Sequence, residues 1–255
     1  MRTNRLRHLW TDGKTAVNAW LTIPSAWTAE VMAHAGFDAV TIDMQHGLMD
    51  YQTSLAMLQS ISATGVVPLV RVPWNDPAAI MRALDAGAYG IICPMINNRK
   101  EAEAFVGACR YAPGGYRSYG PTRAVLSAGE DYVARANDEV LAFAMIETAE
   151  ALRHIEEIAA TRGLDGLYVG PFDLSMSLGL AALADFDDPA LRRALIAVVD
   201  AAARNRLVAG IHADKPGNAA RFSEGGFRLI TTVNDTALLR AAARDALGLA
   251  RNSLG

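Results

Sequence analysis

Residues 141–148 read LAFAMIET, an apolar run of strand character that ends in one carboxylate, Glu147. A second run, GLYVGPFDL at 166–174, carries Asp173 near its end. A buried, unpaired carboxylate is costly unless a cation, a proton or hydrogen-bond donors meet it. Either acid alone is equally well explained as a helix cap or a salt bridge at a strand end. Two acids at the ends of neighbouring strands, taken together, indicate a divalent metal site.

Working outward from these two runs, apolar strand-like segments alternate with helix-like segments along the whole chain. The expected strands are 16–24, 38–44, 66–73, 89–96, 141–148, 166–174, 207–213 and 227–235. The expected helices are 26–35, 51–64, 76–86, 98–109, 149–161, 189–205, 216–224 and 236–247. Ser25 suits the N-cap of the first helix, and Gly36 suits its end.

Three segments fall outside this alternation. A polar arm precedes the first strand, and a loop is expected around SMSLGLAAL at 175–183. Residues 111–137 are rich in glycine and proline and carry several tyrosines. A stretch of that length in a compact domain is too long for a mere connector and usually carries function.

Eight strands joined by connections too long for hairpins predict a closed parallel barrel. The fold class is therefore α/β, with one TIM (β/α)8 barrel spanning residues 1–255. The strands are continuous apolar runs, as expected of parallel strands covered on both faces. A doubly wound open sheet is the alternative, but no glycine-rich phosphate turn follows the first strand.

Composition excludes several classes of function. The net charge of -3 offers no basic surface for nucleic acid. The charged N-terminal segment lacks the apolar core of a signal peptide, and no run approaches the length of a membrane span. Cys93 and Cys109 are far apart and lack metal-ligand spacing. We read both as reduced thiols of a cytoplasmic protein.

In a barrel of this kind the chemistry lies at the C-terminal ends of the strands. Polar or aromatic side chains occur at or just after those ends in five of the runs: Trp20, Asp43, His46, Arg71, Glu147 and Asp173. Each also has a purely structural explanation, since Asp43 can orient a turn, His46 can be a solvated loop residue and Arg71 can pair with Asp43. Of the other histidines, only His212 lies near the end of a strand, the seventh, where it could contact a ligand.

The joint pattern nevertheless favours a site. Carboxylates suit a hard divalent ion whose remaining positions go to water or substrate. A nearby arginine suits a carboxylate or an enolate oxygen, and a histidine held by an acid suits proton transfer near neutral pH. These groups describe a metal-held 2-oxo acid whose neighbouring carbon loses a proton.

Six motifs carry a resemblance to a known family. They are TIDMQHG (41–47), PLVRVP (68–73), DAGAYGIICPMI (85–96), YAPGGYRSYGPTRA (111–124), MIET (145–148) and VGPFDLSMSLG (169–179). Together they resemble the HpcH/HpaI family of class II pyruvate aldolases over nearly the whole chain. The resemblance implies a TIM barrel whose last helix is exchanged between subunits in a homohexamer, a dimer of trimers.

The resemblance also implies roles for individual residues. Glu147 and Asp173 would bind Mg²⁺, Mn²⁺ or Co²⁺, which chelates pyruvate through its carboxylate and keto oxygens. Arg71 would hold the keto oxygen and stabilise the enolate, which then attacks an aldehyde. His46 would be the catalytic histidine, assisted by Asp43 and by Asp85, the latter from a neighbouring subunit. Main-chain donors around Gly170, Pro171, Phe172 and Asp173 would hold the pyruvate carboxylate. Trp20, as an apolar wall at the end of the first strand, and Arg117 and Arg123 of the long loop complete the predicted substrate contacts.

One position departs from the family pattern. Members that cleave 4-hydroxy-2-oxoheptanedioate often carry glutamine two residues before the metal glutamate, where this chain has Met145. A polar contact to pyruvate or its metal is then absent or replaced by water, which leaves the natural acceptor open. Pyruvate or a related 2-oxo acid such as hydroxypyruvate is the expected donor.

Three other functions compete with this reading. A CoA-thioester lyase of the citrate lyase β or malyl-CoA type would need a basic cluster for the CoA phosphates, and none is visible. A lysine-dependent aldolase has only Lys14, Lys100 and Lys215 available, of which Lys215 alone is near the mouth. A non-catalytic barrel that senses an oxo acid is the third. A phosphorylated substrate is disfavoured, because the turns after the last two strands lack a glycine-rich cradle.

Overall fold

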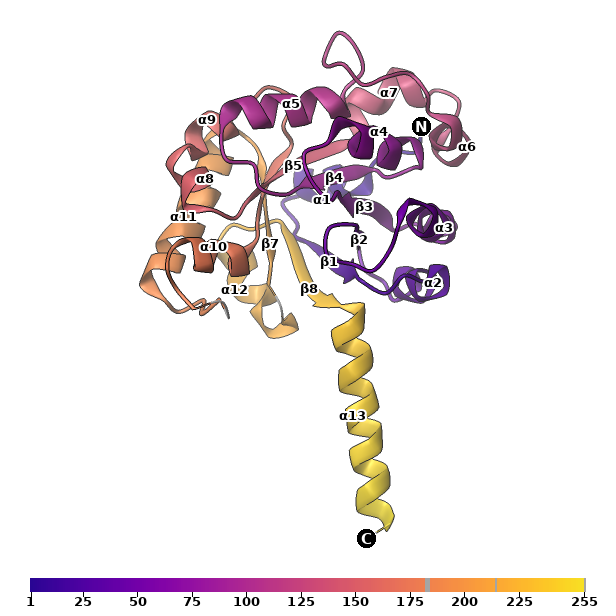
Figure 1. Cartoon of the computed structure of the whole chain (residues 1–255), viewed down its shortest axis with the longest axis vertical. Helices are drawn as coiled ribbons and strands as arrows, with labels where there is room; N and C mark the ends of the chain where they lie inside the picture. Colours follow the sequence, from indigo (N-terminus) through magenta and orange to yellow (C-terminus); the bar gives the residue numbers. More distant parts are fainter. Residues whose placement is uncertain (182–183, 214, 255) are drawn as a thin grey trace.

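The structure, a computed structural model, describes residues 1–181, 184–213 and 215–254. Eight parallel strands close into one barrel in the order of the sequence, and helices surround it (Figure 1). The strands are β1 (Ala16–Leu21), β2 (Ala39–Asp43), β3 (Val67–Arg71), β4 (Gly90–Cys93), β5 (Leu141–Ile146), β6 (Gly166–Val169), β7 (Val208–His212) and β8 (Leu229–Asn234). The predicted fold class is confirmed, and each predicted strand contains one observed strand.

Most of the helices follow strands, as predicted. The helices up to β5 are α1 (Arg5–Thr11), α2 (Ala26–His34), α3 (Tyr51–Ile61), α4 (Pro77–Asp85), α5 (Arg99–Cys109), α6 (Thr122–Ala128) and α7 (Tyr132–Glu139). The later ones are α8 (Ala149–Arg153), α9 (Ile155–Ala159), α10 (Pro171–Ser177), α11 (Pro189–Arg204), the 3₁₀ turn η1 (Pro216–Asn218), α12 (Ala219–Glu224) and α13 (Asp235–Leu254). Ser25 caps α2 as expected, since its side chain accepts from the Thr28 N–H.

The barrel interior contains a polar layer in an otherwise apolar core. The Asn18 side-chain amide bonds to the hydroxyls of Thr41 and Thr231, and the Tyr168 hydroxyl lies 2.5 Å from that of Thr231. All four side chains are buried. Because they satisfy one another, this layer forms a rigid floor beneath the C-terminal ends of the strands.

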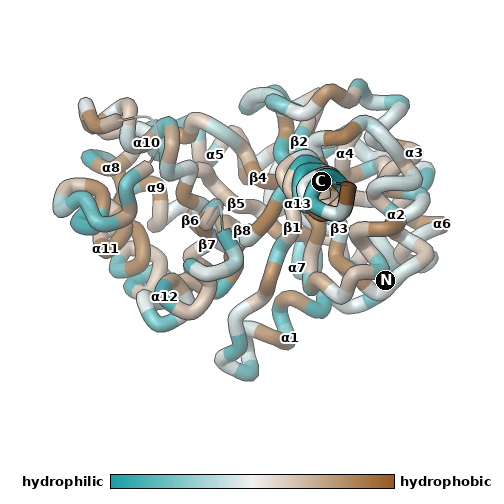
Figure 2. Tube along the Cα trace, turned by 90° about the horizontal axis from the view of Figure 1, so that it is seen from below, coloured by the Kyte–Doolittle hydropathy of each residue, from teal (hydrophilic) through white to brown (hydrophobic). Residues whose placement is uncertain are grey.

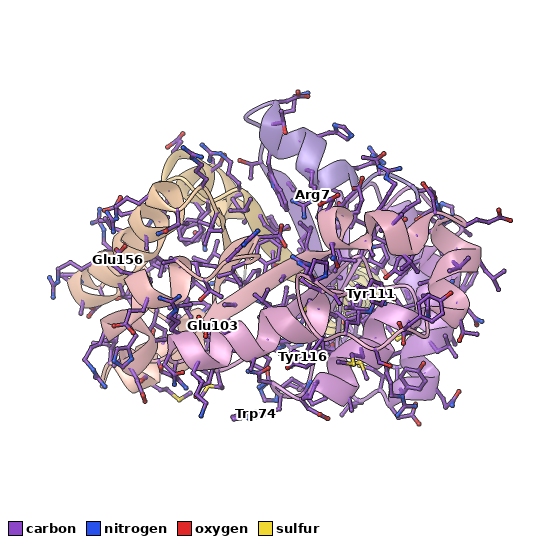
Figure 3. The ribbon with its side chains drawn as sticks, turned by 90° about the horizontal axis from the view of Figure 1, so that it is seen from above. Arg7, Trp74, Glu103, Tyr111, Tyr116 and Glu156 are labelled. Atoms are coloured by element: carbon purple, nitrogen blue, oxygen red, sulfur yellow. The ribbon has the colours of Figure 1, made fainter. Side chains whose placement is uncertain are left out.

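The expected polar arm at the N-terminus is instead a helix that closes the other end of the barrel. Asn4 caps α1 through the Leu6 N–H, and the Trp10 ring packs edge-on against Phe143 of β5 at 6.0 Å between centroids. The Trp10 indole also donates to the Arg228 carbonyl at 2.8 Å. Figure 3 shows Arg7 of α1 and Trp74, which follows β3, at opposite ends of the barrel. The C-terminal mouth of the barrel is therefore the end away from α1.

Residues 111–137 are more ordered than the sequence indicated. They contain α6 and most of α7, and the longest irregular segment is the one before α6. Arg117 anchors that irregular segment: its guanidinium lies 4.5 Å from the Tyr111 ring and donates to the Tyr132 hydroxyl at 3.0 Å. Its charge is met by Asp85 at 2.7 Å. Tertiary contacts of this kind order a segment whose composition alone reads as a loop.

The segment after β6 also differs from expectation. Strand β6 ends at Val169, and Asp173 lies in the first turn of α10 rather than at a strand end. The expected loop at 175–183 begins inside that helix, and its residues Ala182 and Leu183 lie outside the described residues. Pro171 at the first helical position starts α10, because its fixed φ suits a helix and its missing N–H costs nothing there.

The last helix, α13, projects away from the barrel and is seen end-on in Figure 2. It is longer than predicted and almost wholly exposed, and its leucines are among the exposed apolar side chains: Leu238, Leu239, Leu247, Leu249 and Leu254. Its base is fixed by the buried Asp235, which accepts from the N–H groups of Thr22 and Ile23. None of the helices in the described ranges has the length and hydropathy that a membrane crossing requires.

Candidate active site

The candidate site is the ring of inward-facing side chains at the C-terminal end of the barrel. Side chains alternate between the two faces of a strand, so every second residue points inward. The inward positions at the mouth are Trp20 on β1, Asp43 on β2, Arg71 on β3 and Glu147 just after β5. All four are buried. Strand alternation therefore brings these predicted residues together.

Asp43 and Arg71 form a bidentate ion pair across β2 and β3. They are register partners, and Arg71 donates through Nε to Asp43 Oδ1 at 2.8 Å and through Nη2 to Oδ2 at 2.6 Å. Burial alone would raise the pKa of Asp43, but the hydrogen bonds and charge of Arg71 outweigh it and hold the pKa below the ordinary 3.8. The structural explanation of this pair is thus correct, and the pair also fixes the guanidinium at the mouth.

The same carboxylate organises the turn that carries His46. Asp43 Oδ1 accepts from the main-chain N–H groups of Gln45 at 3.1 Å and His46 at 3.3 Å. The imidazole itself is exposed at the rim and makes no hydrogen bond with the described residues. Asp43 therefore holds the backbone of His46 rather than its ring, and the ring lies exposed at the rim of the mouth.

Trp20 supplies an aromatic wall beside Arg71. The guanidinium carbon lies 4.9 Å from the centroid of the Trp20 ring, which stacks on Tyr168 at 5.9 Å. Contact between a cation and an aromatic face is favourable, and more so where water is excluded. Arg71 is thus held on one side by a carboxylate and on the other by an indole.

Glu147 is a buried carboxylate with few compensating partners. Its Oε1 accepts from the Met95 N–H at 2.8 Å. Burial raises the pKa of Glu147 to about 7; the Met95 donor opposes this, the negative charge of Asp173 adds to it and the charge of Arg71 opposes it. A carboxylate whose pKa is raised by burial and by a neighbouring acid is stabilised in its charged form by a nearby cation.

The backbone around Glu147 is shaped for it. Met95 has a φ of 55°, in the left-handed region that side-chain-bearing residues rarely adopt, and this conformation presents its N–H to the carboxylate. A Cβ at Gly170 would lie 2.5 Å from Glu147 Oε2 and 2.6 Å from Met145 Cε. Only glycine leaves space at that oxygen. Neither Met95 nor Gly170 could be assigned such a part from residue type alone.

Glu147 and Asp173 fit a hard divalent cation. Both offer carboxylate oxygens, and Asp173 is close enough to influence the Glu147 pKa. Within the described ranges no group of three or more His, Cys, Asp or Glu side chains is placed to bind a metal. Two carboxylates leave most positions of such an ion to water and substrate, as is usual for Mg²⁺.

The other predicted residues near this mouth are the start of α10 and its aromatic neighbour. Gly170, Pro171 and Phe172 lead into Asp173, and the N–H groups of the first turn of a helix have no partner within it. Phe172 is half-buried and packs edge-on to His212 at 6.4 Å between centroids. This first turn therefore lies beside the carboxylate pair.

Three predicted residues are not brought to this mouth within one chain. Asp85 ends α4, and helices run antiparallel to the strands, so it lies near the start of β4 at the opposite end. Burial raises the pKa of Asp85, although its ion pair with Arg117 opposes the shift. Arg123 donates to the carbonyls of Ala86 and Leu58. In one protomer Arg117 and Arg123 are structural.

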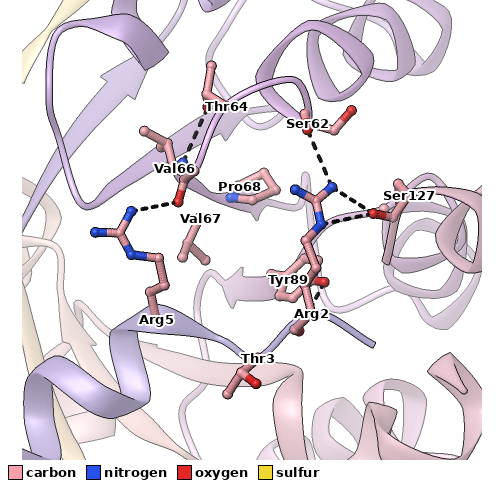
Figure 4. A pocket seen from close by; sticks show the side chains of 12 residues that line it. Arg2, Thr3, Arg5, Ser62, Thr64, Val66, Val67, Pro68, Tyr89 and Ser127 are labelled. Atoms are coloured by element: carbon pink, nitrogen blue, oxygen red, sulfur yellow. Dashed lines mark hydrogen bonds between the residues drawn. The ribbon is translucent and has the colours of Figure 1, made fainter. Parts of the chain in front are cut away.

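A hollow of about 110 Å³ at that opposite end is not the active site (Figure 4). Arg2 and Arg5 line it, and their guanidinium groups donate to the carbonyls of Ser62, Ser127 and Gly65. Ser62 and Ser127 lie at helix C-termini, where unpaired carbonyls and the helix dipole attract cations. These arginines are accounted for by the fold.

A (β/α)8 barrel whose C-terminal mouth holds the buried Glu147 beside a half-buried Asp173, a clamped arginine and a rim histidine has the groups that a metal-assisted lyase requires. The comparisons agree. The sequence profile of the HpcH/HpaI aldolase/citrate lyase family matches residues 17–242, and the chain belongs to this family.

Individual relatives align over almost the whole chain. The chain is 42% identical to a hydroxypyruvate/pyruvate aldolase of Rhizorhabdus wittichii over 248 residues, 97% of this chain and 99% of the relative. It is 35% identical to a 4-hydroxy-2-oxo-heptane-1,7-dioate aldolase of Escherichia coli, with 91% and 88% covered. A crystal structure of a family member from Burkholderia cenocepacia superposes with a TM-score of 0.90 at 35% identity and covers 98% of this chain and 100% of that one. The predicted family and enzyme class are thereby confirmed.

Proposed function

We propose that this aldolase joins the enolate of pyruvate, or of a related 2-oxo acid such as hydroxypyruvate, to an aldehyde, and reversibly cleaves 4-hydroxy-2-oxo acids. The observation that carries the proposal is the buried Glu147, close enough to Asp173 and to the Arg71 guanidinium for both charges to act on it. Enolate formation places negative charge on the keto oxygen, and preorganised positive groups stabilise that charge most effectively in a water-poor site. The relatives named above act on substrates of this class.

Aldolases of this family use divalent metal ions. We assign the ion to Glu147 and Asp173, with Mg²⁺, Mn²⁺ or Co²⁺ as candidates. When bound, it would act as a Lewis acid that draws electron density from the donor's keto group. Among the described residues neither Glu147 nor Asp173 forms an ion pair with a basic side chain, because Arg71 is paired with Asp43 and Arg117 with Asp85.

The remaining roles fall to groups of the chain itself. Arg71 would bind the keto oxygen, and Asp43 would keep its guanidinium in position. His46, at the rim, would take the proton from the donor's methyl carbon and later return one to the new hydroxyl. The N–H groups of Phe172 and Asp173, at the start of α10, would bind the donor carboxylate.

We further propose that the working enzyme is a homohexamer, a dimer of trimers, in which α13 exchanges between subunits. Its exposed leucines support this, since large apolar side chains on a projecting helix are stable only against another surface. Asp85 would then reach the mouth of a neighbouring subunit. Size measurement with and without residues 236–255 tests the assembly; a full-length monomer would contradict it.

The first experiment is deuterium exchange into the methyl group of pyruvate, followed by NMR. It detects enolate formation without requiring the natural aldehyde. We expect exchange with Mn²⁺ or Mg²⁺, none with a chelator, and none for Arg71→Ala. The exposed variant Glu103→Gln should exchange like wild type. No exchange with any divalent ion would overturn the proposal. If exchange is observed, a screen of aldehydes can identify the acceptor.

A further inference from the structure

His212 belongs to the inward-facing layer at the mouth. On β7 it is two residues after Gly210, so both face the same side of the strand. That side is the interior, because a Cβ at Gly210 would lie 2.6 Å from the Tyr168 ring. His212 ends β7 and therefore lies one layer above Tyr168, at the C-terminal rim.

Its neighbours are the walls of the proposed site. The His212 ring meets Trp20 edge-on at 5.1 Å and Phe172 at 6.4 Å between centroids. Trp20 in turn lies against Arg71, and Phe172 directly precedes Asp173. His212 is thus separated from Arg71 by the Trp20 ring alone, and its other aromatic neighbour, Phe172, belongs to the same helical turn as Asp173. No step of the proposed reaction assigns a role to it.

The chemistry of this position suits a neutral hydroxyl group. In the proposed function, the keto oxygen and the carboxylate of a 2-oxo acid are already bound by Arg71, by the metal on Glu147 and Asp173, and by the start of α10. Two aromatic rings beside His212 favour a group that needs little hydration. A neutral imidazole offers one donor and one acceptor nitrogen, which matches a hydroxyl that also donates and accepts. Because the ring has two nitrogens, it can bind a substrate while keeping a partner within the protein.

We propose that His212 determines specificity by hydrogen-bonding a hydroxyl of the substrate, an inference that rests on the proposed aldolase function. The hydroxyl comes from one of two sources. It is carried either by the reacting carbon of the donor, as in hydroxypyruvate, or by the carbon next to the aldehyde group of the acceptor. Both offer the same chemistry to the imidazole.

The test measures kcat/KM for four substrate pairs with the metal-loaded enzyme: pyruvate or hydroxypyruvate, each with propanal or glyceraldehyde. His212→Phe keeps an aromatic ring but removes both nitrogens. We expect about a tenfold loss for pairs that carry the recognised hydroxyl and less than about a twofold change for the others, the size of one hydrogen bond. His212→Asn, which keeps a donor and an acceptor, should recover part of the loss.

The pattern of losses identifies the source. A loss confined to hydroxypyruvate assigns the donor hydroxyl, and a loss confined to glyceraldehyde assigns the acceptor. An equal loss for all four pairs, or no loss, overturns the inference. Methyl exchange of pyruvate separates the role of His212 from the proposed aldolase function. If wild type and His212→Phe both exchange and the variant keeps the wild-type preference for hydroxyl-bearing substrates, only the role of His212 is refuted. Absence of exchange in wild type refutes the proposed function, and the inference with it.

Discussion

Glu147→Gln tests whether the buried carboxylate destabilises the protein until a cation meets it. Burial raises the folded-state pKa to about 7 from an ordinary 4.5. Since the folded value is the higher one, the contribution to stability is full below pH 4.5 and is lost as the pH rises through 7. At about 1.4 kcal/mol for each pH unit between these two pKa values, the free energy of unfolding of the metal-free protein falls by about 3 kcal/mol.

Glutamine stays neutral throughout this range, and its amide oxygen can still accept from the Met95 N–H. With a chelator present, we therefore expect Glu147→Gln to be about 3 kcal/mol more stable than wild type at pH 8 and nearly equal to it at pH 4. The measurement is urea unfolding at one protein concentration. Added Mn²⁺ should stabilise wild type and leave the variant almost unchanged.

The matched control is Glu103→Gln, which neutralises an exposed carboxylate paired with Arg99 on α5. Its free energy of unfolding should differ little from wild type at either pH. A Glu147→Gln protein that is less stable than wild type at pH 8 in chelator would refute the reasoning. The carboxylate would then already be compensated without a metal.

Three other substitutions test the site and its support. Arg71→Lys should lower the rate of pyruvate methyl exchange at least about 100-fold, because an ammonium group cannot bind Asp43 with two parallel bonds while it faces the substrate. Gly170→Ala places a methyl 2.5 Å from Glu147 Oε2, so Mn²⁺ affinity measured by calorimetry should fall at least about tenfold. Asp235→Ala leaves the partly buried N–H groups of Thr22 and Ile23 unpaired after β1 and should lower the free energy of unfolding by about 2 kcal/mol in urea.

Controls separate these effects from general damage. Gly217→Ala adds the same methyl where no atom lies within 4 Å, so Mn²⁺ affinity should not change. Asp187→Ala removes an exposed aspartate and should change the free energy of unfolding by less than about 0.5 kcal/mol. Near-wild-type exchange in Arg71→Lys, or unchanged Mn²⁺ affinity in Gly170→Ala, would contradict the roles assigned to those residues.

The barrel itself could be predicted from local patterns. Parallel strands covered on both faces need continuous apolar residues, and caps such as Ser25 and Asp76 mark where helices begin. The position of Asp43 and Arg71 at strand ends follows from the same patterns. The sequence allowed these two residues to pair, and the pairing depends only on the register of the neighbouring strands β2 and β3. In the structure they are register partners.

Other features depended on contacts between distant segments. Helix α1 is stabilised by packing Leu6 and Trp10 under the barrel, which no local pattern in a polar segment reveals. Met95 and Gly170 both adjoin Glu147: the Met95 N–H bonds to its carboxylate, and a side chain at Gly170 would collide with it. Glu147 lies more than 20 residues from each of them along the chain, so no local pattern shows these contacts.

By itself, then, the sequence determined the eight-strand alternation, the family and the acids and arginine of the mouth, because strand periodicity and motif spacing are local properties. Only the tertiary structure decided that Asp173 sits on a helix, that Asp85 lies at the far end within one chain, and that His212 joins the wall of the site. Those placements depend on how strands close into a barrel and where helices return, which is a property of the whole chain.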